Sequence, residues 1–322
     1  MLLFDLNEDP TFGKALAAAL DVPVAPHELR RFEDGECKQR PLTDPCGADV
    51  YLLQSLHGDR AHGPHDRLLR LLMFAATLRE HGAARVTAVL PYLAYARKDR
   101  RTQGFDPNSL RYVAQLVEAV GVTQVIALEV HNPAAFENAF RCTTQPVASR
   151  PAFDPTVLAW AAAGPLAVVS PDPGGVKRAQ LWHEALESRV GHPLEFAFCD
   201  KRRSGGQLGG TDLVAGKVRG MTAVLVDDLI VSGQTLRRAA LALREVGASR
   251  VVACAAHGLF SDAACAALGD DAVSEIVVGD GVPWPGPAGS APWQALRQKV
   301  RTASCVQPMA EAVRRSHEGW RR

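Results

Sequence analysis

Residues 223–236 read Ala223-Val-Leu-Val-Asp-Asp-Leu-Ile-Val-Ser-Gly-Gln-Thr-Leu236. It joins a short apolar run, typical of a buried strand, to an amphipathic helical pattern over Gln234–Val246. At the carboxyl end of a parallel strand, the adjacent acids Asp227 and Asp228 can accept hydrogen bonds from two vicinal hydroxyls. The turn after them can offer N–H groups and hydroxyls to a phosphate at the start of the helix. The stretch predicts a site for a phosphorylated sugar, although an Asp-Asp pair can also simply start a loop and Ser232 can simply cap a helix.

Similar strand and helix patterns alternate on both sides of this stretch. We expect strands at Val86–Leu90, Gln124–Leu128, Leu166–Ser170, Ala223–Val226, Val251–Ala255 and Glu275–Val278. We expect helices at His65–His81, Ser109–Val120 and Gln234–Val246, each ended by a glycine: Gly82, Gly121 and Gly247. Such alternation predicts an α/β fold in which a mainly parallel sheet is flanked by helices.

The chain also contains an internal similarity. Leu78-Arg-Glu-His-Gly-Ala-Ala-Arg-Val-Thr-Ala88 matches Leu243-Arg-Glu-Val-Gly-Ala-Ser-Arg-Val-Val-Ala253, half a chain length further on. Helix–Gly–strand junctions can converge on such sequences, but the spacing fits two related domains. A length of 322 residues suits two domains as well. We place the domains at residues 1–147 and 148–322, with the boundary inside the proline-containing stretch Thr143–Pro155.

Composition limits the class of partner. With 47% hydrophobic and 22% charged residues, the chain is typical of a folded globular protein. A formal net charge of +1 gives no overall field for nucleic acid or an anionic membrane. The seven cysteines form no C-x-x-C pair, no apolar run reaches bilayer length, and acidic residues appear too early for a signal peptide. We therefore expect a cytoplasmic protein that binds small molecules, not nucleic acid and not a membrane.

A second segment, Pro91-Tyr-Leu-Ala-Tyr-Ala-Arg-Lys-Asp-Arg-Arg101, follows a predicted strand directly. Its two aromatic side chains can contact a base, and its cations can bind a polyphosphate. An Arg/Lys run is often just a solvated surface, but this one ends a buried strand. The segment predicts a nucleotide site.

Both segments resemble known motifs. Ala223–Leu236 resembles the motif shared by type I phosphoribosyltransferases and phosphoribosyl pyrophosphate synthetases, with Val231 at an often acidic position and Gln234 where Gly is usual. Pro91–Arg101 resembles the ATP-site signature of the synthetases, which the transferases lack. The chain is therefore identified as a divergent member of the synthetase (ribose-phosphate pyrophosphokinase) family. This resemblance implies two tandem type I phosphoribosyltransferase-like domains.

Further segments resemble the same family in the same order. Arg31-Phe-Glu-Asp-Gly-Glu36 resembles its adenine-recognition segment, so the resemblance implies an ATP site made by Phe32, Asp34, Glu36, Arg97, Lys98 and Asp99. Leu128-Glu-Val-His131 and Ser170-Pro-Asp-Pro-Gly-Gly-Val-Lys-Arg-Ala179 match segments near the metal, which assigns Mg²⁺ to His131 and Asp172. Asp200-Lys-Arg-Arg203 resembles the start of the catalytic loop, which assigns catalysis to Lys201 and Arg203.

The resemblance also implies an activity. It implies transfer of pyrophosphate from ATP to the 1-hydroxyl of ribose 5-phosphate, giving phosphoribosyl pyrophosphate and AMP, in a homo-oligomer (dimer or hexamer). Ribose 5-phosphate is assigned to Asp227, Asp228, Ser232, Gly233, Gln234 and Thr235. Two alternatives stay open: a catalytically silent homologue that regulates a true synthetase, and a phosphoribosyltransferase. The three cations at 201–203 disfavour the first alternative, and the Pro91–Arg101 signature disfavours the second.

Overall fold

A computed structural model describes residues 1–200, 203–204, 207–208, 213–286 and 290–321. Its contacts form two compact units. Unit 1 contains Met1–Ser149, Gly281–Pro283 and Cys305–Arg322, and unit 2 contains Arg150–Asp280 and Trp284–Ser304. The split after Ser149 lies close to the expected one at 147/148, but the C-terminal segment belongs to unit 1 and not to the second domain.

Unit 1 is built on a five-stranded sheet in the order β1-β4-β5-β6-β7, and all its strands are parallel. A two-stranded antiparallel hairpin, β2–β3, lies outside this sheet. The strands are β1 (Leu2–Asp5), β2 (His27–Arg31), β3 (Cys37–Pro41), β4 (Asp49–Leu53), β5 (Arg85–Leu90), β6 (Gln124–Leu128) and β7 (Thr143–Val147). The helices are α1 (Thr11–Leu20), α2 (Pro64–Glu80), α3 (Ser109–Ala119), α4 (Pro133–Ala139) and α10 (Val306–Arg321).

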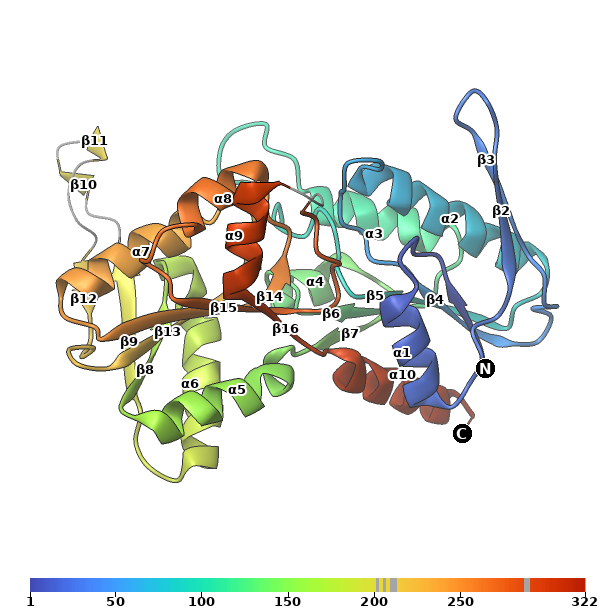
Figure 1. Ribbon diagram of the computed structural model, residues 1–322. Coiled ribbons are helices and arrows are strands. Elements are labelled where there is room, and N and C mark those ends of the chain that lie inside the picture. Colours follow the sequence, from blue (N-terminus) through green and yellow to red (C-terminus); the bar gives the residue numbers. More distant parts are fainter. Residues whose placement is uncertain (201–202, 205–206, 209–212, 287–289, 322) are drawn as a thin grey trace. The chain divides into compact units, whose positions relative to one another are not determined.

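Helices cover both faces of the unit 1 sheet (Figure 1). On one face, alternate strand residues such as Val50 and Leu52 pack with α2, α3 and α4 in one buried cluster. On the other face α10 lies against α1, β6 and β7, and its side chains Met309 and Val313 are fully buried. Burial of this apolar stripe explains why the C-terminal segment belongs to unit 1.

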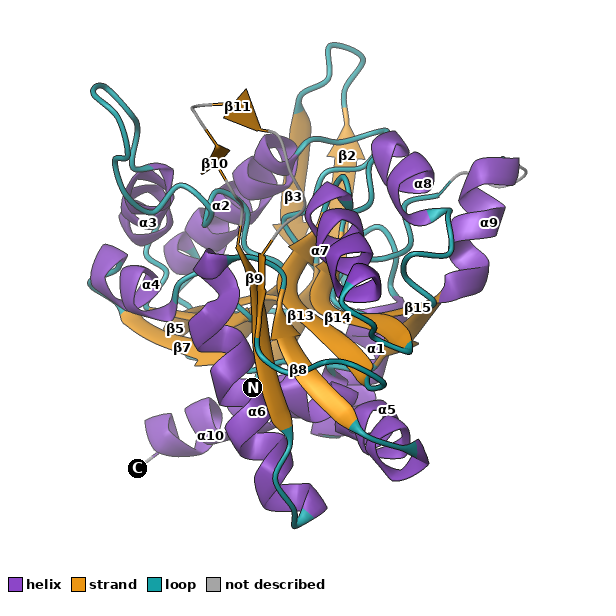
Figure 2. Ribbon diagram, turned by 90° about the vertical axis from the view of Figure 1, so that its left-hand side faces the viewer, coloured by secondary structure: helices purple, strands orange, loops and turns teal. Residues whose placement is uncertain are grey.

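Unit 2 is built on a seven-stranded sheet in the order β12-β9-β8-β13-β14-β15-β16, parallel except for the edge pair β12–β9. The strands are β8 (Leu166–Ser170), β9 (Glu195–Asp200), β12 (Leu213–Ala215), β13 (Thr222–Ile230), β14 (Arg250–Gly258), β15 (Glu275–Gly279) and β16 (Val300–Ala303), with a separate pair β10 (Arg203–Ser204) and β11 (Gln207–Leu208). The helices are α5 (Arg150–Ala163), the short 3₁₀ helix η1 (Pro173–Gly175), α6 (Val176–Val190), α7 (Gln234–Glu245), α8 (Asp262–Leu268) and α9 (Ala291–Lys299). Buried clusters place α7, α8 and α9 on one face of this sheet and α5 and α6 on the other (Figure 2).

The α/β fold with mainly parallel sheets is confirmed, and the predicted strands and helices are all present. The proline-containing stretch Thr143–Pro155, in which we placed the domain boundary, forms the end strand β7 and the first turns of α5, and the split between the units after Ser149 falls inside it. Pro151 lies in the first turn of α5, where a backbone N–H has no helical partner in any case. Pro155 lies further inside the same helix. The prolines on either side of the split therefore lie within regular secondary structure.

Two observations bear on the remaining expectations from composition. No helix in the described ranges is both long and apolar enough to cross a membrane. None of the seven cysteines, all within these ranges, forms a disulfide; Cys37 and Cys46 are exposed and Cys142 is half-buried.

Candidate functional site

The acid pair of unit 2, Asp227 and Asp228, lies in β13, which extends further than its neighbour β8. β13 pairs with β8 only as far as Leu225, opposite Val169, but it continues along β14 as far as Ile230, opposite Gly258. Asp227 and Asp228 are therefore strand residues at the open carboxyl edge of the sheet. The predicted strand ended at Val226 because the acids interrupt the apolar run; pairing with β14 carries the strand through them.

A guanidinium faces both acids. Arg178, in the first turn of α6, places Nη1 3.2 Å from Asp228 Oδ1 and 3.9 Å from Asp227 Oδ1. Burial and the neighbouring Asp228 charge raise the pKa of Asp227, whereas Arg178 acts in the opposite direction. One cation thus partly offsets two adjacent carboxylates. Sequence reasoning missed Arg178, although Ser170–Ala179 contains it, because only Asp172 was taken from that segment.

The turn after β13 leads directly into α7. Gly233 has φ +70° and precedes α7, and a Cβ there would lie 2.6 Å from Leu268 Cδ1, so this position requires glycine. Ser232 and Thr235 are half-buried, whereas the Gln234 side chain is exposed. These four residues, as predicted from the sequence, come together at the N-terminus of a 12-residue helix. Its unpaired N–H groups and dipole favour an anion.

Asp172 lies at the same edge of the unit 2 sheet, after β8. It caps η1, because its Oδ1 accepts a hydrogen bond from the Gly175 N–H at 3.1 Å, and its carbonyl accepts one from Ser170 Oγ at 2.7 Å. A Cβ at Gly175 would lie 2.8 Å from Ser170 Oγ, so the turn is tightly packed. Asp172 is half-buried, and the turn holds its carboxylate in place.

The cationic segment of unit 1 follows β5. Arg97 is exposed, and within the described part of the chain its guanidinium has no hydrogen bond or ion pair. Lys98 instead donates to Asp106 at 2.5 Å and to Thr102 at 3.1 Å. The hydrogen bond from Lys98 is the main reason why the pKa of Asp106 lies well below its usual range. Arg97 is thus available to a ligand, whereas Lys98 must exchange a partner to bind one.

The neighbouring strand β6 contributes to the same edge. Asp99 Oδ2 accepts a hydrogen bond from Asn132 Nδ2 at 2.8 Å, and Asn132 also caps α4 through Ala135 N–H. His131, next to Asn132, is exposed. The bond therefore joins the loop that contains the predicted ATP residues to the loop that contains the predicted metal ligand.

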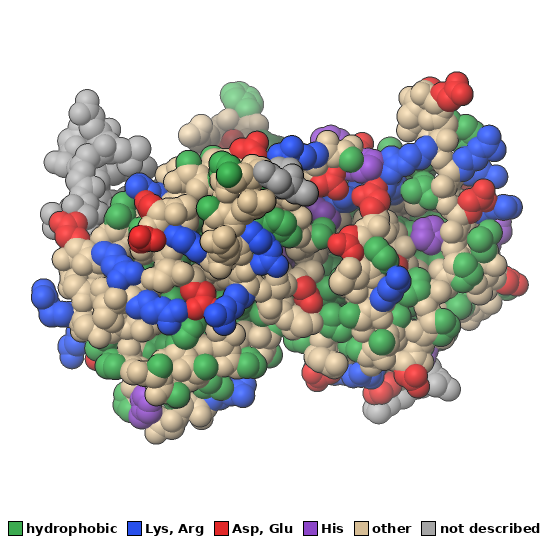
Figure 3. Space-filling view, viewed as in Figure 1, with side chains coloured by type: hydrophobic (Ala, Val, Ile, Leu, Met, Phe, Trp, Pro, Cys, Tyr) green, Lys and Arg blue, Asp and Glu red, His purple; other side chains and the backbone are tan. Residues whose placement is uncertain are grey.

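The hairpin β2–β3 stands out from the rest of unit 1 (Figures 1 and 3). Its connection contains Phe32, Asp34 and Glu36, all exposed. Asp34 Oδ1 accepts the Glu36 N–H at 3.1 Å, and the Arg30 guanidinium lies 5.1 Å from the centre of the Phe32 ring. The tip thus presents one aromatic ring and two carboxylates.

The binding residues predicted from the sequence are divided between the two units. Phe32, Asp34, Glu36, Arg97, Lys98, Asp99 and His131 belong to unit 1, and Asp172 and the Asp227–Thr235 residues belong to unit 2. Of the two predicted catalytic residues, Lys201 lies outside the described residues, and so does the side chain of Arg203.

Comparisons with known proteins agree along the whole chain. Residues 1–121 match the model of the N-terminal domain of ribose phosphate pyrophosphokinase, and residues 211–321 match that of the phosphoribosyl synthetase-associated domain. The ribose-phosphate pyrophosphokinase of Prochlorococcus marinus is 34% identical over 98% of this chain and 90% of its own, and that of Haemophilus influenzae is 34% identical over 97% and 95%.

A solved structure agrees as well. The phosphoribosylpyrophosphate synthetase of Mycobacterium smegmatis superimposes with a TM-score of 0.86 at 29% identity, over 99% of both chains. A parallel sheet with an acid pair and phosphate-type loop in one unit, a cationic segment in the other, and full-length similarity to these enzymes lead to one conclusion: the chain belongs to the ribose-phosphate pyrophosphokinase family.

Proposed function

We propose that this protein transfers the β,γ-pyrophosphoryl group of ATP to the 1-hydroxyl of ribose 5-phosphate, forming phosphoribosyl pyrophosphate and AMP. The observation that carries the proposal is the site of unit 2, where Asp227 and Asp228 lie near the carboxyl end of β13, shortly before the loop Ser232–Thr235. Relatives that share the full length of the chain are named for this activity.

The unit 2 site supports the binding of ribose 5-phosphate. The carboxylates of Asp227 and Asp228 accept hydrogen bonds from the vicinal 2- and 3-hydroxyls of the ribose. The N–H groups of Ser232–Thr235, together with the hydroxyls of Ser232 and Thr235, bind the 5-phosphate at the start of α7. These two contacts hold the sugar at both ends and so fix the direction of its 1-hydroxyl.

The unit 1 residues support the binding of ATP. The exposed guanidinium of Arg97 suits the triphosphate, and Lys98 adds a second cation when it exchanges Asp106 for phosphate. Asp99 joins the cationic loop to the loop after β6, because its carboxylate accepts a hydrogen bond from Asn132. The exposed ring of Phe32 stacks on adenine, and Asp34 and Glu36 accept from its amino group.

The residues assigned to the metal fit Mg²⁺. Mg²⁺ commonly takes one or two protein ligands and completes its shell with phosphate oxygens and waters. The Asp172 carboxylate is fixed by Gly175 and keeps a second oxygen for a ligand, and His131 is exposed at the end of β6. When bound, Mg²⁺ neutralises triphosphate charge.

The chemical step is a displacement at phosphorus. The 1-hydroxyl oxygen bonds to the β-phosphorus of ATP and gives up its proton to solvent, while the bond from that phosphorus to the α,β-bridging oxygen breaks and AMP leaves with that oxygen. Such a step needs alignment and charge neutralisation more than a covalent intermediate. We assign the stabilisation of the developing charge to Lys201 and Arg203, following the family resemblance.

We also place the enzyme in the cytoplasm as a homo-oligomer (dimer or hexamer).

The test is product identity. Purified protein is incubated with Mg-ATP and ribose 5-phosphate, and the nucleotides are separated by chromatography. AMP that appears only when ribose 5-phosphate is present supports the proposal. ADP in its place would indicate a simple sugar-phosphate kinase, and no reaction would favour a silent homologue.

A substitution in the phosphate loop gives a sharper expectation. Gly233→Ala forces a Cβ against Leu268 and a left-handed conformation onto alanine, so the loop must shift. We expect the KM for ribose 5-phosphate to rise about tenfold, which corresponds to roughly 1.4 kcal/mol, with the KM for ATP unchanged. Gly220→Ala is the matched control, because Gly220 has φ +74° but nothing within 4 Å of an added Cβ. Equal KM values for the two variants would contradict the assignment of the loop.

A further inference from the structure

The hairpin β2–β3 is tied to the body of unit 1 by an ion-pair cluster near its tip. Arg31, the last residue of β2, donates to Glu8 Oε1 at 3.1 Å and to His62 Nε2 at 2.6 Å. Glu8 follows β1, and His62 lies in the loop between β4 and α2. Arg31 directly precedes Phe32, so the tie lies beside the proposed adenine contact.

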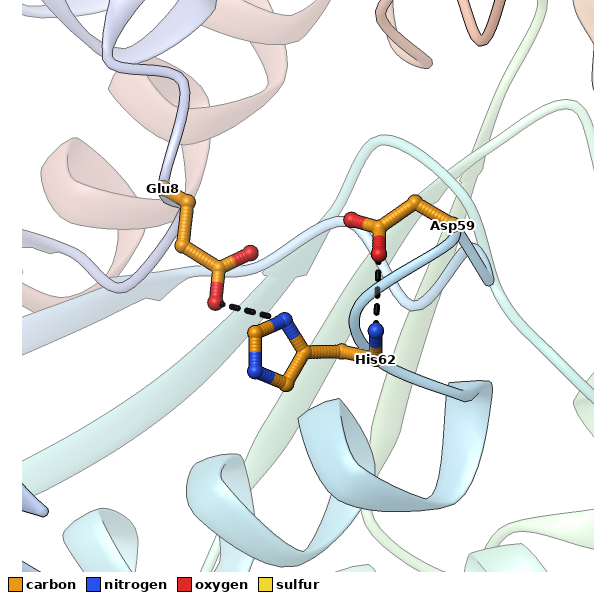
Figure 4. Close-up of side chains that lie close together, drawn as sticks. All are labelled: Glu8, Asp59 and His62. Carbon is orange, nitrogen blue, oxygen red and sulfur yellow. Dashed lines mark hydrogen bonds and ion pairs between the residues drawn. The ribbon is translucent and has the colours of Figure 1, made fainter.

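Glu8 is the centre of this cluster. Besides Arg31, it accepts from Arg70 at 2.7 Å and from Arg67 at 2.9 Å, and His62 Nδ1 lies 3.1 Å from its Oε1 (Figure 4). The side chains of Arg67 and Arg70 are 4% and 6% exposed, so α2 presents two buried cations that need a counter-charge. Partial burial opposes ionisation of Glu8, but hydrogen bonds from Arg70 and Arg67 hold its pKa below the usual range. Arg67 and Arg70 thus keep the Glu8 carboxylate ionised and hold it in place, independently of Arg31.

The cluster does not suit a metal ion. Glu8, Asp59 and His62 are close enough to share one, as Figure 4 shows. However, Arg31 and Arg67 donate directly to these groups: Arg31 to Glu8 and His62, and Arg67 to Glu8 and Asp59. A divalent cation would meet the guanidinium charges, and the carboxylates are already neutralised. The cluster therefore holds side chains in place by hydrogen bonds and ion pairs and does not bind a metal.

We propose that Glu8 is a positioning residue for ATP: it holds Arg31, and through Arg31 it fixes the hairpin tip in the conformation that presents Phe32 to adenine. The inference rests on the proposed function.

The physical basis is the cost of ordering an exposed loop. The hairpin tip is exposed, and the ion pair Arg40–Glu28 joins β3 to β2 within the hairpin itself. Without the tie at Arg31, the tip would be ordered only when ATP binds. Ordering a side chain or short loop on binding weakens affinity by about fivefold.

The test compares Arg31→Gln, Glu8→Gln, the double variant and the matched control Arg40→Gln. Arg31 and Arg40 are comparably exposed, at 48% and 56%, and each makes an ion pair with a glutamate, but only Arg31 is tied to the body of unit 1. Measured quantities are kcat, the KM for Mg-ATP, the KM for ribose 5-phosphate and the Tm. Glu8→Gln also removes the counter-charge of buried Arg70, and the exposed Arg31→Gln therefore provides the variant that leaves folding intact.

The expected result is specific. Arg31→Gln and Glu8→Gln each raise the KM for Mg-ATP about fivefold, the double variant does so no further, and the KM for ribose 5-phosphate stays unchanged. The Tm falls only in the variants that lack Glu8. Arg40→Gln behaves as wild type.

Three results would overturn the inference. If both single variants keep the wild-type KM for Mg-ATP, the tie does not position the tip. If only Arg31→Gln raises it, Arg31 acts on ATP itself and Glu8 has no positioning role. If Arg40→Gln raises it equally, hairpin charge is the cause. Failure of the proposed function is recognised separately, because wild-type protein would then form no AMP.

Discussion

Arg178→Gln is expected to lower kcat/KM for ribose 5-phosphate about 100-fold, the usual cost of removing one preorganised charged donor from an active site. Arg178 is 14% exposed, and its guanidinium faces the carboxylates of both Asp227 and Asp228. Burial and Asp228 raise the pKa of Asp227 to about 8 even with Arg178 present, and without Arg178 that pKa rises further, so the protonated acid persists to higher pH. A protonated acid is a weaker acceptor for the ribose hydroxyls.

The same variant is expected to shift the pH profile in a defined direction. Arg178 lowers the pKa of Asp227 against the effects of burial and of Asp228, so its removal raises that pKa further. The acidic limb of kcat/KM for ribose 5-phosphate should therefore move to higher pH. Initial rates measured across pH 5–9 would detect the shift.

Two controls accompany Arg178→Gln. Arg178→Lys keeps the charge and should retain more activity and a profile closer to wild type. Lys177→Gln removes a neighbouring exposed cation from the same helix and should change neither quantity. A wild-type kcat/KM in Arg178→Gln would mean that the guanidinium is not needed by the acid pair.

Asp49→Ala is expected to destabilise unit 1 by about 3–5 kcal/mol, the cost of leaving a buried charge without its partner. The Asp49 side chain is fully buried at the start of β4 and accepts two hydrogen bonds from Arg85, at 2.7 and 2.8 Å. It also accepts from His317 Nδ1 at 2.6 Å and from the Tyr51 hydroxyl at 3.0 Å. Its loss leaves the largely buried cation of Arg85 without this partner and removes a bond that holds α10 to the sheet.

Calorimetry and proteolysis would measure this effect. The transition of unit 1 should fall by about 10 °C, and trypsin should cleave α10 at Arg314 or Arg315 faster than in the wild type. Glu311→Ala, which removes an exposed i,i+4 pair with Arg315, should leave the Tm within about 2 °C. An unchanged Tm in Asp49→Ala would show that the Asp49–Arg85 pair does not stabilise unit 1.

Most of the fold could be predicted because buried parallel strands and amphipathic helices have distinct apolar patterns. Gln124–Leu128 and Leu166–Ser170 have the predicted bounds, and Gly82 and Gly247 adopt the positive φ values expected after helices. The hairpin β2–β3 was not predicted, because its strands are charged and largely exposed and so lack the alternation of a half-buried strand.

The ends of β13 and β14 were also missed. Asp227 and His257 interrupt the apolar pattern, and only the pairing between the two strands keeps these residues extended. Pairing between the strands, and not local composition, therefore sets where β13 and β14 end. The same limit applies to α10, whose apolar stripe is visible in the sequence but whose partners, α1 and the unit 1 sheet, are distant in the chain.

Within the candidate site, the residues that lie in short motifs could be selected from the sequence alone. Ser232–Thr235 and the acid pair are contiguous, and the chemistry of each type of side chain indicated its ligand. Arg178 and Glu8 act through partners far away in the sequence, so no local pattern distinguishes them from surface charges. Their contacts appear only when the chain is folded.

The fate of two labels on ATP distinguishes pyrophosphoryl transfer from the transfer of a single phosphate. Protein, Mg²⁺ and ribose 5-phosphate are incubated with ATP labelled at the γ-phosphorus or at the α-phosphorus, and the products are separated. Pyrophosphoryl transfer predicts γ-label in the sugar product together with an unlabelled β-phosphate, and α-label in AMP. Formation of α-labelled ADP, with the sugar gaining only the γ-phosphate, would contradict the account.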